Sequence, residues 1–227
     1  MTALFRLKIL ALDTSTEYCS AALWIEGRAS QRLEHAGQRH SLLLLPMVDE
    51  LLREAGLSIR GLDAIAAAVG PGSFTGLRIA TAVAQGLAFG ADLPVIPVGT
   101  LEALAQGSEA ELVATALDAR MGELYFAAFR RRPAATETVI APVLVAPESV
   151  PDLPAGRWTG CCNGFDRLGE RLALRLPSVS VRHDCNPEAR HVAALAAARF
   201  AAGERHGPEA LVPLYLRDKV ALTMAER

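Results

Sequence analysis

The stretch Val69-Gly70-Pro71-Gly72-Ser73-Phe74-Thr75-Gly76-Leu77-Arg78 carries the strongest prediction of the fold. It follows an apolar run over residues 62–69 and opens a helical pattern over residues 75–90, so it predicts a strand, a glycine-rich turn and a helix N-terminus. Proteins bind phosphate groups with this geometry. The glycines equally allow two backbones to pack closely, and Ser73 and Thr75 can cap the helix start. Either role fits the residues.

Strand and helix patterns alternate on both sides of this stretch. Up to residue 107 they predict strands over residues 7–13, 19–25, 28–34, 62–69 and 94–98, and helices over residues 40–55, 75–90 and 101–106. The first three strands follow one another as a meander. Gly56 ends the helix over residues 40–55, as a residue just past a helix C-terminus often does.

The second half of the chain begins like the first. Ala116-Leu117-Asp118 repeats Ala11-Leu12-Asp13, and each triplet ends an apolar strand before a turn. Further strands are predicted over residues 123–130, 138–145 and 157–160, and helices over residues 165–174 and 187–202. This order of elements predicts a duplicated α/β fold with mixed sheets and flanking helices. We expect an N-terminal lobe over residues 1–107 and a C-terminal lobe over residues 108–227.

Composition narrows the class of protein. The chain has 227 residues, is 51% hydrophobic and 21% charged, and carries a formal net charge of −2, as expected for a soluble globular protein. The basic residues are scattered, so autonomous RNA binding is not expected. The cysteines, at positions 19, 161, 162 and 185, form neither a zinc motif nor a disulfide framework. We expect reduced thiols, a cytoplasmic protein and no membrane or signal segment, because Lys8 and Asp13 interrupt the apolar N-terminus.

Four segments resemble the bacterial TsaB family, also called YeaZ. They are ILALDTST (9–16), AVGPGSFTGLRIATAVAQGLAFG (68–90), LDARMGELYFA (117–127) and PLYLRDKVA (213–221). The resemblance implies the duplicated, ribonuclease H-like fold that actin, sugar kinases and Hsp70 ATPases share, known as ASKHA. In each lobe we therefore expect an actin-like unit, with partner-binding helices in the first and a C-terminal tail that packs back on it.

The resemblance also implies a function. The family takes part in adding threonylcarbamoyl to the adenosine beside the anticodon in tRNAs that decode codons starting with A. Its members are accessory, non-catalytic subunits that bind the catalytic paralogue TsaD and, with it, the ATPase TsaE. They form homodimers when alone and reach tRNA only through the complex. We therefore expect no cofactor of the chain's own, and expect ATP and a metal ion in the partner subunits.

The chain departs from the catalytic paralogue at the metal site. There the stretch reads like IPVHHMEGHL, whose histidines four residues apart can hold a metal ion. Here the corresponding stretch is IPVGTLEALA, residues 96–105, and Thr100 and Leu104 stand in the ligand positions. A hydroxyl and an isobutyl group cannot replace two imidazoles. We expect no metal site and no catalytic residue.

A vestigial nucleotide site is the main alternative to a purely structural role for the loops. The glycine-rich loop lacks the lysine of a Walker A motif and is one residue too long for a dinucleotide fingerprint. In actin-like ATPases and kinases, however, the first phosphate loop falls where residues 13–16 lie here. The candidate residues are Asp13, Thr14, Ser15, Gly70, Gly72 and Ser73. The structural alternative is that Asp13 and Asp118 only cap turns. A small ATPase or kinase is the competing function.

Other candidate sites are weaker. The histidines at positions 35, 40, 183, 191 and 206 form no metal motif, which argues against peptidase chemistry. Cys185 follows His183 and Asp184, but adjacent residues seldom point together, so we do not expect an activated thiol from these neighbours. Residues 156–164 correspond to the adenosine region of the fold, where Trp158 and the paired cysteines make a weak match.

The helix over residues 75–90 is apolar on almost every side and must therefore be covered on every side. Leu77, Ala80, Ala84 and Ala88 can face its own sheet. We expect a partner to cover the remaining sides of this helix. The same partner would cover the residues of the helix over residues 40–55 that lie off its stripe of Leu45, Val48 and Leu52. The predicted interface residues are Leu43, Met47, Arg78, Ile79, Val83 and Leu87. Alternatively, the two helices cover each other within one lobe.

Overall fold

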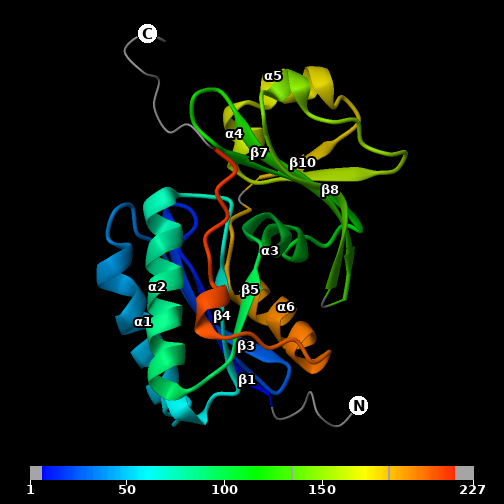
Figure 1. Cartoon of the computed structure of the whole chain (residues 1–227). Helices are drawn as coiled ribbons and strands as arrows, with labels where there is room; N and C mark the ends of the chain where they lie inside the picture. The colour runs from blue at the N-terminus through cyan, green and yellow to red at the C-terminus, as the bar shows by residue number, and fades with distance from the viewer. Residues whose placement is uncertain (1–6, 134, 184, 218–227) are drawn as a thin grey trace.

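The computed structural model describes residues 7–133, 135–183 and 185–217, and it contains two five-stranded sheets (Figure 1). In the first sheet the strand order is β3-β2-β1-β4-β5, with β1 antiparallel to β2 and parallel to β4. Its strands are β1 (Lys8–Asp13), β2 (Tyr18–Ile25), β3 (Arg28–His35), β4 (Ala64–Ala68) and β5 (Val95–Val98). The predicted meander and both later strands are confirmed.

The second sheet repeats the first. Its order is β8-β7-β6-β9-β10, again with a central strand antiparallel on one side and parallel on the other. Its strands are β6 (Leu112–Asp118), β7 (Leu124–Arg132), β8 (Ala135–Val145), β9 (Trp158–Cys161) and β10 (Ser180–Arg182). The duplication expected from the two Ala-Leu-Asp triplets is therefore confirmed, since β1 and β6 occupy the same place in their sheets.

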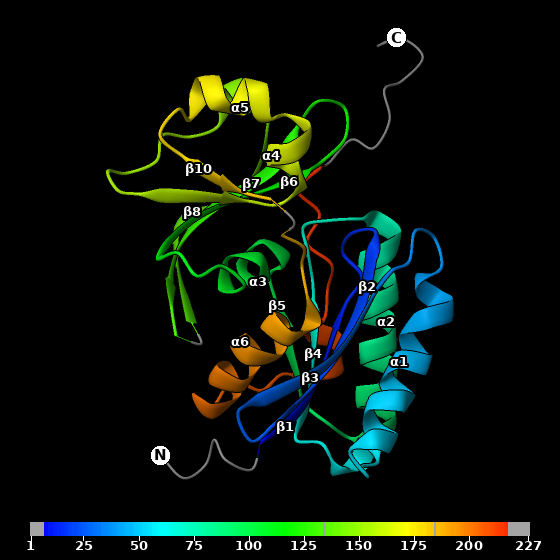
Figure 2. The same ribbon diagram turned by 180° about the vertical axis from the view of Figure 1, so that it is seen from behind.

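Helices cover both faces of the first sheet (Figures 1 and 2). Helices α1 (His40–Glu54) and α2 (Phe74–Ala91) lie on one face, and α6 (Ala189–Ala201) lies on the other. Successive side chains of a strand point to opposite faces, so Leu10 and Leu12 of β1 pack beneath α1 and α2 while Ile9 and Ala11 pack beneath α6. Both faces of β1 are therefore apolar.

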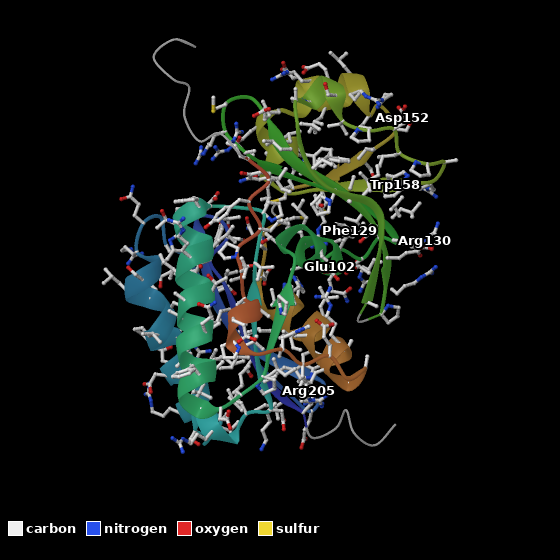
Figure 3. All side chains as sticks on the ribbon, in the orientation of Figure 1. Glu102, Phe129, Arg130, Asp152, Trp158 and Arg205 are labelled. Atoms are coloured by element: carbon white, nitrogen blue, oxygen red, sulfur yellow. The ribbon has the colours of Figure 1, made fainter. Side chains whose placement is uncertain are left out.

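Each half of the chain contributes one helix that packs on the sheet of the other half. Helix α3 (Thr100–Gln106) follows the first sheet in sequence, yet its Leu101 and Leu104 pack beneath the second sheet with Phe129. Conversely, α6 follows the second sheet and packs on the first. The two helices are joined by an ion pair of 2.6 Å between Arg199 of α6 and Glu102 of α3. Figure 3 marks Glu102 and Phe129 at this junction between the lobes.

The structure corrects one predicted helix and adds one strand. The helix expected over residues 165–174 is two helices, α4 (Asn163–Arg167) and α5 (Gly169–Arg175), because Leu168 leaves the helical region with φ −122°. Strand β10 was not predicted. Short 3-10 turns also occur: η2 (Ile59–Gly61), η3 (Pro147–Ser149) and η4 (Pro208–Ala210). No helix within the described ranges is both long enough and apolar enough to cross a bilayer.

The predicted apolar stripe of α1 is only partly correct, since Val48 is buried and Leu52 packs against the core but Leu45 does not. Leu45 is 50% exposed, whereas Met47, assigned to the partner side, is 8% exposed and lies in the core. The buried stripe consists of Leu44, Met47, Val48 and Leu51. The sheet-facing side of α2 is as predicted, since Leu77, Ala80, Ala84 and Ala88 are fully buried.

Candidate functional site

Two loops meet at the C-terminal ends of β1 and β4. The glycine-rich loop packs so tightly on residues 13–15 that a Cβ atom at Gly72 would overlap the Ser15 carbonyl oxygen, and one at Gly76 would overlap that of Thr14. Hydrogen bonds join the loops as well: Ser73 N donates to Ser15 O at 2.7 Å, and Thr14 Oγ1 donates to the Gly76 carbonyl at 2.6 Å. These glycines are required for backbone packing.

Asp13 is buried beneath this contact. Its Oδ1 accepts hydrogen bonds from Ser15 N at 2.8 Å and Ser15 Oγ at 2.6 Å, so it caps the turn as the structural alternative predicted. Its Oδ2 is buried and has no hydrogen-bond partner in the structure. Burial raises the pKa of this carboxyl to about 6, and the two bonds from Ser15 oppose that rise only in part.

A cleft of about 530 Å³ opens between the lobes beside the two loops. The first lobe contributes the exposed sides of both loops and the N-terminus of α2, where Ser73 Oγ accepts a hydrogen bond from Gly76 N at 3.2 Å. The second lobe contributes the β6–β7 turn and α4. The lining residues are Ser15, Thr16, Glu17, Gly37, His40, Gly72, Ser73, Phe74, Leu117, Asp118, Ala119, Arg120, Met121, Tyr125, Asn163, Arg167 and Arg217.

The second-lobe wall is built around Asp118. Its Oδ1 accepts from Arg120 N at 2.9 Å, which caps the turn as Asp13 does in the first lobe. Its Oδ2 pairs with Arg167 at 2.7 Å and with Arg120 at 3.6 Å, and its backbone N–H donates to Asn163 Oδ1 at 2.9 Å. The turn-capping prediction is thus confirmed for both aspartates.

A C-terminal strap, residues 211–217, runs from the first lobe to the second (Figure 1), and its last residue, Arg217, lines the cleft. It begins at Leu211, which is fully buried in the first core, and Leu214 N donates to Val69 O at 2.6 Å. It ends at Arg217, which pairs with Glu123 at 2.7 Å and donates to Ala119 O at 3.1 Å. The strap therefore ties the lobes together. The matching motif continues past residue 217, outside the described residues.

Arg78 is engaged within the chain by this strap. Its guanidinium carbon lies 3.7 Å from the centroid of the Phe74 ring, and its Nε donates to the Tyr215 hydroxyl at 2.9 Å. Such a stacked cation is stabilised by the ring electrons. The Arg78 side chain is exposed, and its stacking partner Phe74 lines the cleft.

The structure thus brings the six nucleotide-site candidates together, but it buries four of them, Gly70 and the three residues of the first loop. Asp13, Thr14 and Ser15 are each at most 1% exposed, and only Ser15, Gly72 and Ser73 line the cleft. The sequence prediction missed three cations that do line it, namely Arg120, Arg167 and Arg217. Each of these arginines is paired with a carboxylate of the chain, Arg120 and Arg167 with Asp118 and Arg217 with Glu123, so an anion in the cleft would compete with those pairs.

Helix α3, which contains Thr100 and Leu104 in place of the paralogue's metal ligands, does not line the cleft. Thr100 and Leu104 of α3 are 0% and 2% exposed, packed between the lobes. The Thr100 hydroxyl has no hydrogen-bond partner in the structure. Within the described ranges no group of three or more His, Cys, Asp or Glu side chains is arranged to hold a metal ion.

The outer surface of α1 and α2 is a second candidate site. We name it the α1–α2 surface and define it by the exposed residues Leu42, Leu45, Ala82, Gly86 and Phe89. Leu42 is 71% exposed and Phe89 is 83% exposed. Of the predicted interface residues, Leu43, Ile79, Val83 and Leu87 lie at its border, half-buried against the first core.

Comparisons with known proteins converge. A family model described as TsaD, tRNA N6-adenosine threonylcarbamoyltransferase, matches residues 34–224. The tRNA threonylcarbamoyladenosine biosynthesis protein TsaB of Escherichia coli (strain K12) is 39% identical over 228 residues, covering 95% of this chain and 96% of that protein. A tRNA N6-adenosine threonylcarbamoyltransferase of Nitratidesulfovibrio vulgaris (strain DP4) is 48% identical over 86 residues, 37% of this chain and 24% of the transferase. YeaZ from Pseudomonas aeruginosa superposes with a TM-score of 0.86 at 40% identity, covering 92% of this chain and all of that structure.

Proposed function

Because the chain belongs to the TsaB (YeaZ) family, we propose that it is a non-catalytic subunit of the machinery that makes threonylcarbamoyladenosine in tRNA. The family and the duplicated actin-like fold expected from the sequence are both confirmed. Under this proposal, the chain binds the catalytic paralogue TsaD in the cytoplasm and activates it. The α1–α2 surface is the observation that carries this proposal.

The α1–α2 surface has the composition of a protein interface. Arg78, which stacks on Phe74, is the one charged residue among the exposed positions of α2. The other exposed positions on this side carry no charge, although a solvent-facing helix side is normally charged; they are Thr75, Ala82, Gly86, Phe89 and Gly90. A Cβ atom at Gly86 would meet no atom within 4 Å, so the fold of this chain does not require a glycine there. Glycine inside a helix costs about 0.5–1 kcal/mol relative to alanine. A glycine at position 86 would allow a helix from another chain to approach α2 closely.

The occupant we propose for this surface is TsaD. The transferase relative and the family model share sequence with this chain, so the two proteins are paralogues that present related helices. The same surface would serve a homodimer when the chain is alone, and homodimer and heterodimer would then compete. TsaE joins through the pair, and tRNA is reached only through the complex. ATP and the metal ion belong to the partner subunits.

The position of α3 supports a non-catalytic role. Thr100 and Leu104, which stand where the paralogue has two histidines, are buried in the junction between the lobes. The neighbouring Glu102 is held by Arg199 and by Thr136 Oγ1 at 2.7 Å. This helix therefore acts as packing between the lobes.

A matched pair of substitutions tests the partner surface. Ala82→Arg places a charge at the centre of the α1–α2 surface, whereas Ala201→Arg places the same charge at the exposed end of α6. Both sites are exposed, so both variants keep the unfolding temperature of the isolated chain. Light scattering during size-exclusion chromatography with TsaD from the same organism would show the complex lost for Ala82→Arg, because a buried unpaired charge costs several kcal/mol. An intact complex with this variant would rule out the surface.

A small ATPase or kinase is the second candidate, favoured by the three arginines and the α2 N-terminus that line the cleft. Calorimetric titration of the isolated chain with magnesium ATP distinguishes the two functions. Tight, magnesium-dependent binding that is lost in Arg167→Ala would favour the ATPase or kinase. Absence of binding favours the accessory role.

A further inference from the structure

Three of the four cysteines converge beneath the second sheet. Cys161 ends β9, Cys162 follows it, and Cys185 lies in the segment after β10. Cys161 and Cys162 are buried in the cluster formed by α3 and the second sheet, and the half-buried Cys185 packs against that cluster. Cys185 is thus the accessible member of a buried group of thiols.

The surroundings of Cys185 favour its thiolate. In the pairing of β10 with β9, Arg182 lies opposite Cys161, and Cys185 follows three residues later. The Cys185 thiol lies 3.5 Å from Arg182 O and 3.7 Å from His183 O, and its sulfur also interacts with the Cys161 thiol, the Cys162 N–H and the Arg182 guanidinium. The Cys161 contact is the largest cause, and together these groups lower the pKa of Cys185 to about 7 although partial burial and Asp166 oppose them. His183 is held elsewhere, with Nδ1 2.5 Å from Asp166 Oδ1.

The two sulfurs differ in character. The contact with Cys185 and burial both raise the pKa of Cys161, so that thiol keeps its proton and donates it toward Cys185. Cys162 is also buried, and desolvation raises its pKa. A thiolate is the reactive form toward peroxides, and a neighbouring thiol can then resolve the product. Cys185 is therefore the partly exposed and more readily ionised sulfur, and Cys161 is its fully buried neighbour.

We propose that Cys185 is a peroxide-sensitive thiol and that Cys161 is its resolving partner in a reversible disulfide. In the first step the Cys185 sulfur attacks one oxygen of a hydroperoxide. The O–O bond breaks, a sulfenic acid forms, and the other oxygen leaves as water or an alcohol after taking a proton. In the second step the Cys161 sulfur attacks the Cys185 sulfur, the S–O bond breaks, and the hydroxyl leaves as water with the thiol proton. Two thiols are oxidised by one peroxide.

The bond would act on the connection between the lobes. Residues 183–188 lead from β10 in the second sheet to α6 on the first sheet. Joining Cys185 to the end of β9 fixes this connection to the second lobe. The strap at residues 211–217 is a separate connection and would remain unchanged.

The test is a thiol count with peptide mapping on the whole reduced chain. After treatment with stoichiometric hydrogen peroxide, denaturation and alkylation, mass spectrometry should show two free thiols lost and one disulfide linking Cys161 to Cys185. Cys19 and Cys162 should be alkylated, and dithiothreitol should restore both lost thiols. The proposal is overturned if all four thiols remain free, or if the disulfide joins other cysteines.

Single substitutions separate the two roles. Cys185→Ser should lower the rate of thiol loss at least about tenfold. Cys161→Ser should leave Cys185 as a sulfenic acid that dimedone traps, and Cys19→Ser is the matched control that should behave like the unchanged chain. Circular dichroism confirms that each variant is folded, and Cys185→Ala replaces the serine variant if that one is not. An unchanged rate in the Cys185 variant would contradict the assignment.

Discussion

Asp13 makes a pH-dependent contribution to stability that can be calculated from its burial. The folded chain holds the pKa of this carboxyl at about 6, against 3.8 for a free side chain. The folded state therefore binds more protons than the unfolded state between these values, and the free energy of unfolding falls as pH rises through that window. A shift of about 2 units corresponds to about 3 kcal/mol. Of this, about 1.3 kcal/mol is lost between pH 5 and pH 7.

Asp13→Asn removes the charge but keeps an oxygen that can accept from Ser15. Its amide nitrogen takes the place of the unpartnered Oδ2 at a cost that does not depend on pH. Urea unfolding at several pH values measures the free energy of unfolding of both proteins. Relative to the unchanged chain, the value for Asp13→Asn should rise by about 1.3 kcal/mol from pH 5 to pH 7. Asp49→Asn is the control, because that side chain is 77% exposed and should change by less than about 0.5 kcal/mol. Parallel curves for Asp13→Asn and the unchanged chain would refute the reasoning.

Three further predictions concern packing, an ion pair and a thiol. Gly76→Ala should lower the free energy of unfolding by about 3 kcal/mol because its Cβ overlaps a backbone carbonyl, whereas Gly86→Ala should raise it by about 0.5–1 kcal/mol, both measured by urea unfolding. Arg199→Met should cost about 2 kcal/mol in the same assay, since it leaves the carboxylate of Glu102, whose side chain is 16% exposed, without its cation. Alkylation of Cys185 by iodoacetamide should rise with pH and reach half its maximum near pH 7.

Each of these predictions has an outcome that contradicts it. Equal stabilities of the two glycine variants would mean that the loops do not pack as described. A neutral Arg199→Met would mean that the pair contributes no more than an exposed one. An alkylation midpoint above pH 8 would mean that the thiolate of Cys185 is not stabilised by its neighbours.

Much of the fold followed from the sequence because local chemistry and the global fold agree. Each Ala-Leu-Asp triplet ends a central strand, and both aspartates cap the following turn through short side-chain bonds. The glycine-rich stretch predicted its own strand, turn and helix. The division of the chain at residue 107 stays a prediction, as do the interface residues.

The failures have identifiable physical causes. Four consecutive leucines at residues 42–45 leave the phase of α1 ambiguous, and packing on the sheet selected Leu44 over Leu45. Strand β10 has three exposed residues and no apolar alternation, so only pairing with β9 reveals it. A helix was expected to continue through Leu168, where the chain instead breaks.

The site residues were harder to predict than the fold. Arg120, Arg167 and Arg217 come from three distant segments, and only the tertiary structure gathers them at the cleft. Cys161 and Cys185 are likewise brought together only by the tertiary structure, because two helices and a strand separate them along the chain. Spacing along a sequence carries no signal for such clusters.

Reconstitution of the tRNA modification tests the central claim most directly. Purified TsaD, TsaE, the enzyme that makes the activated intermediate, ATP and tRNA are combined with and without this chain, and threonylcarbamoyladenosine is measured in the digested tRNA. We predict product only when the chain and TsaD are both present, none with the chain in place of TsaD, and a loss of product with Ala82→Arg but not with Ala201→Arg. Full product formation without the chain would contradict the account.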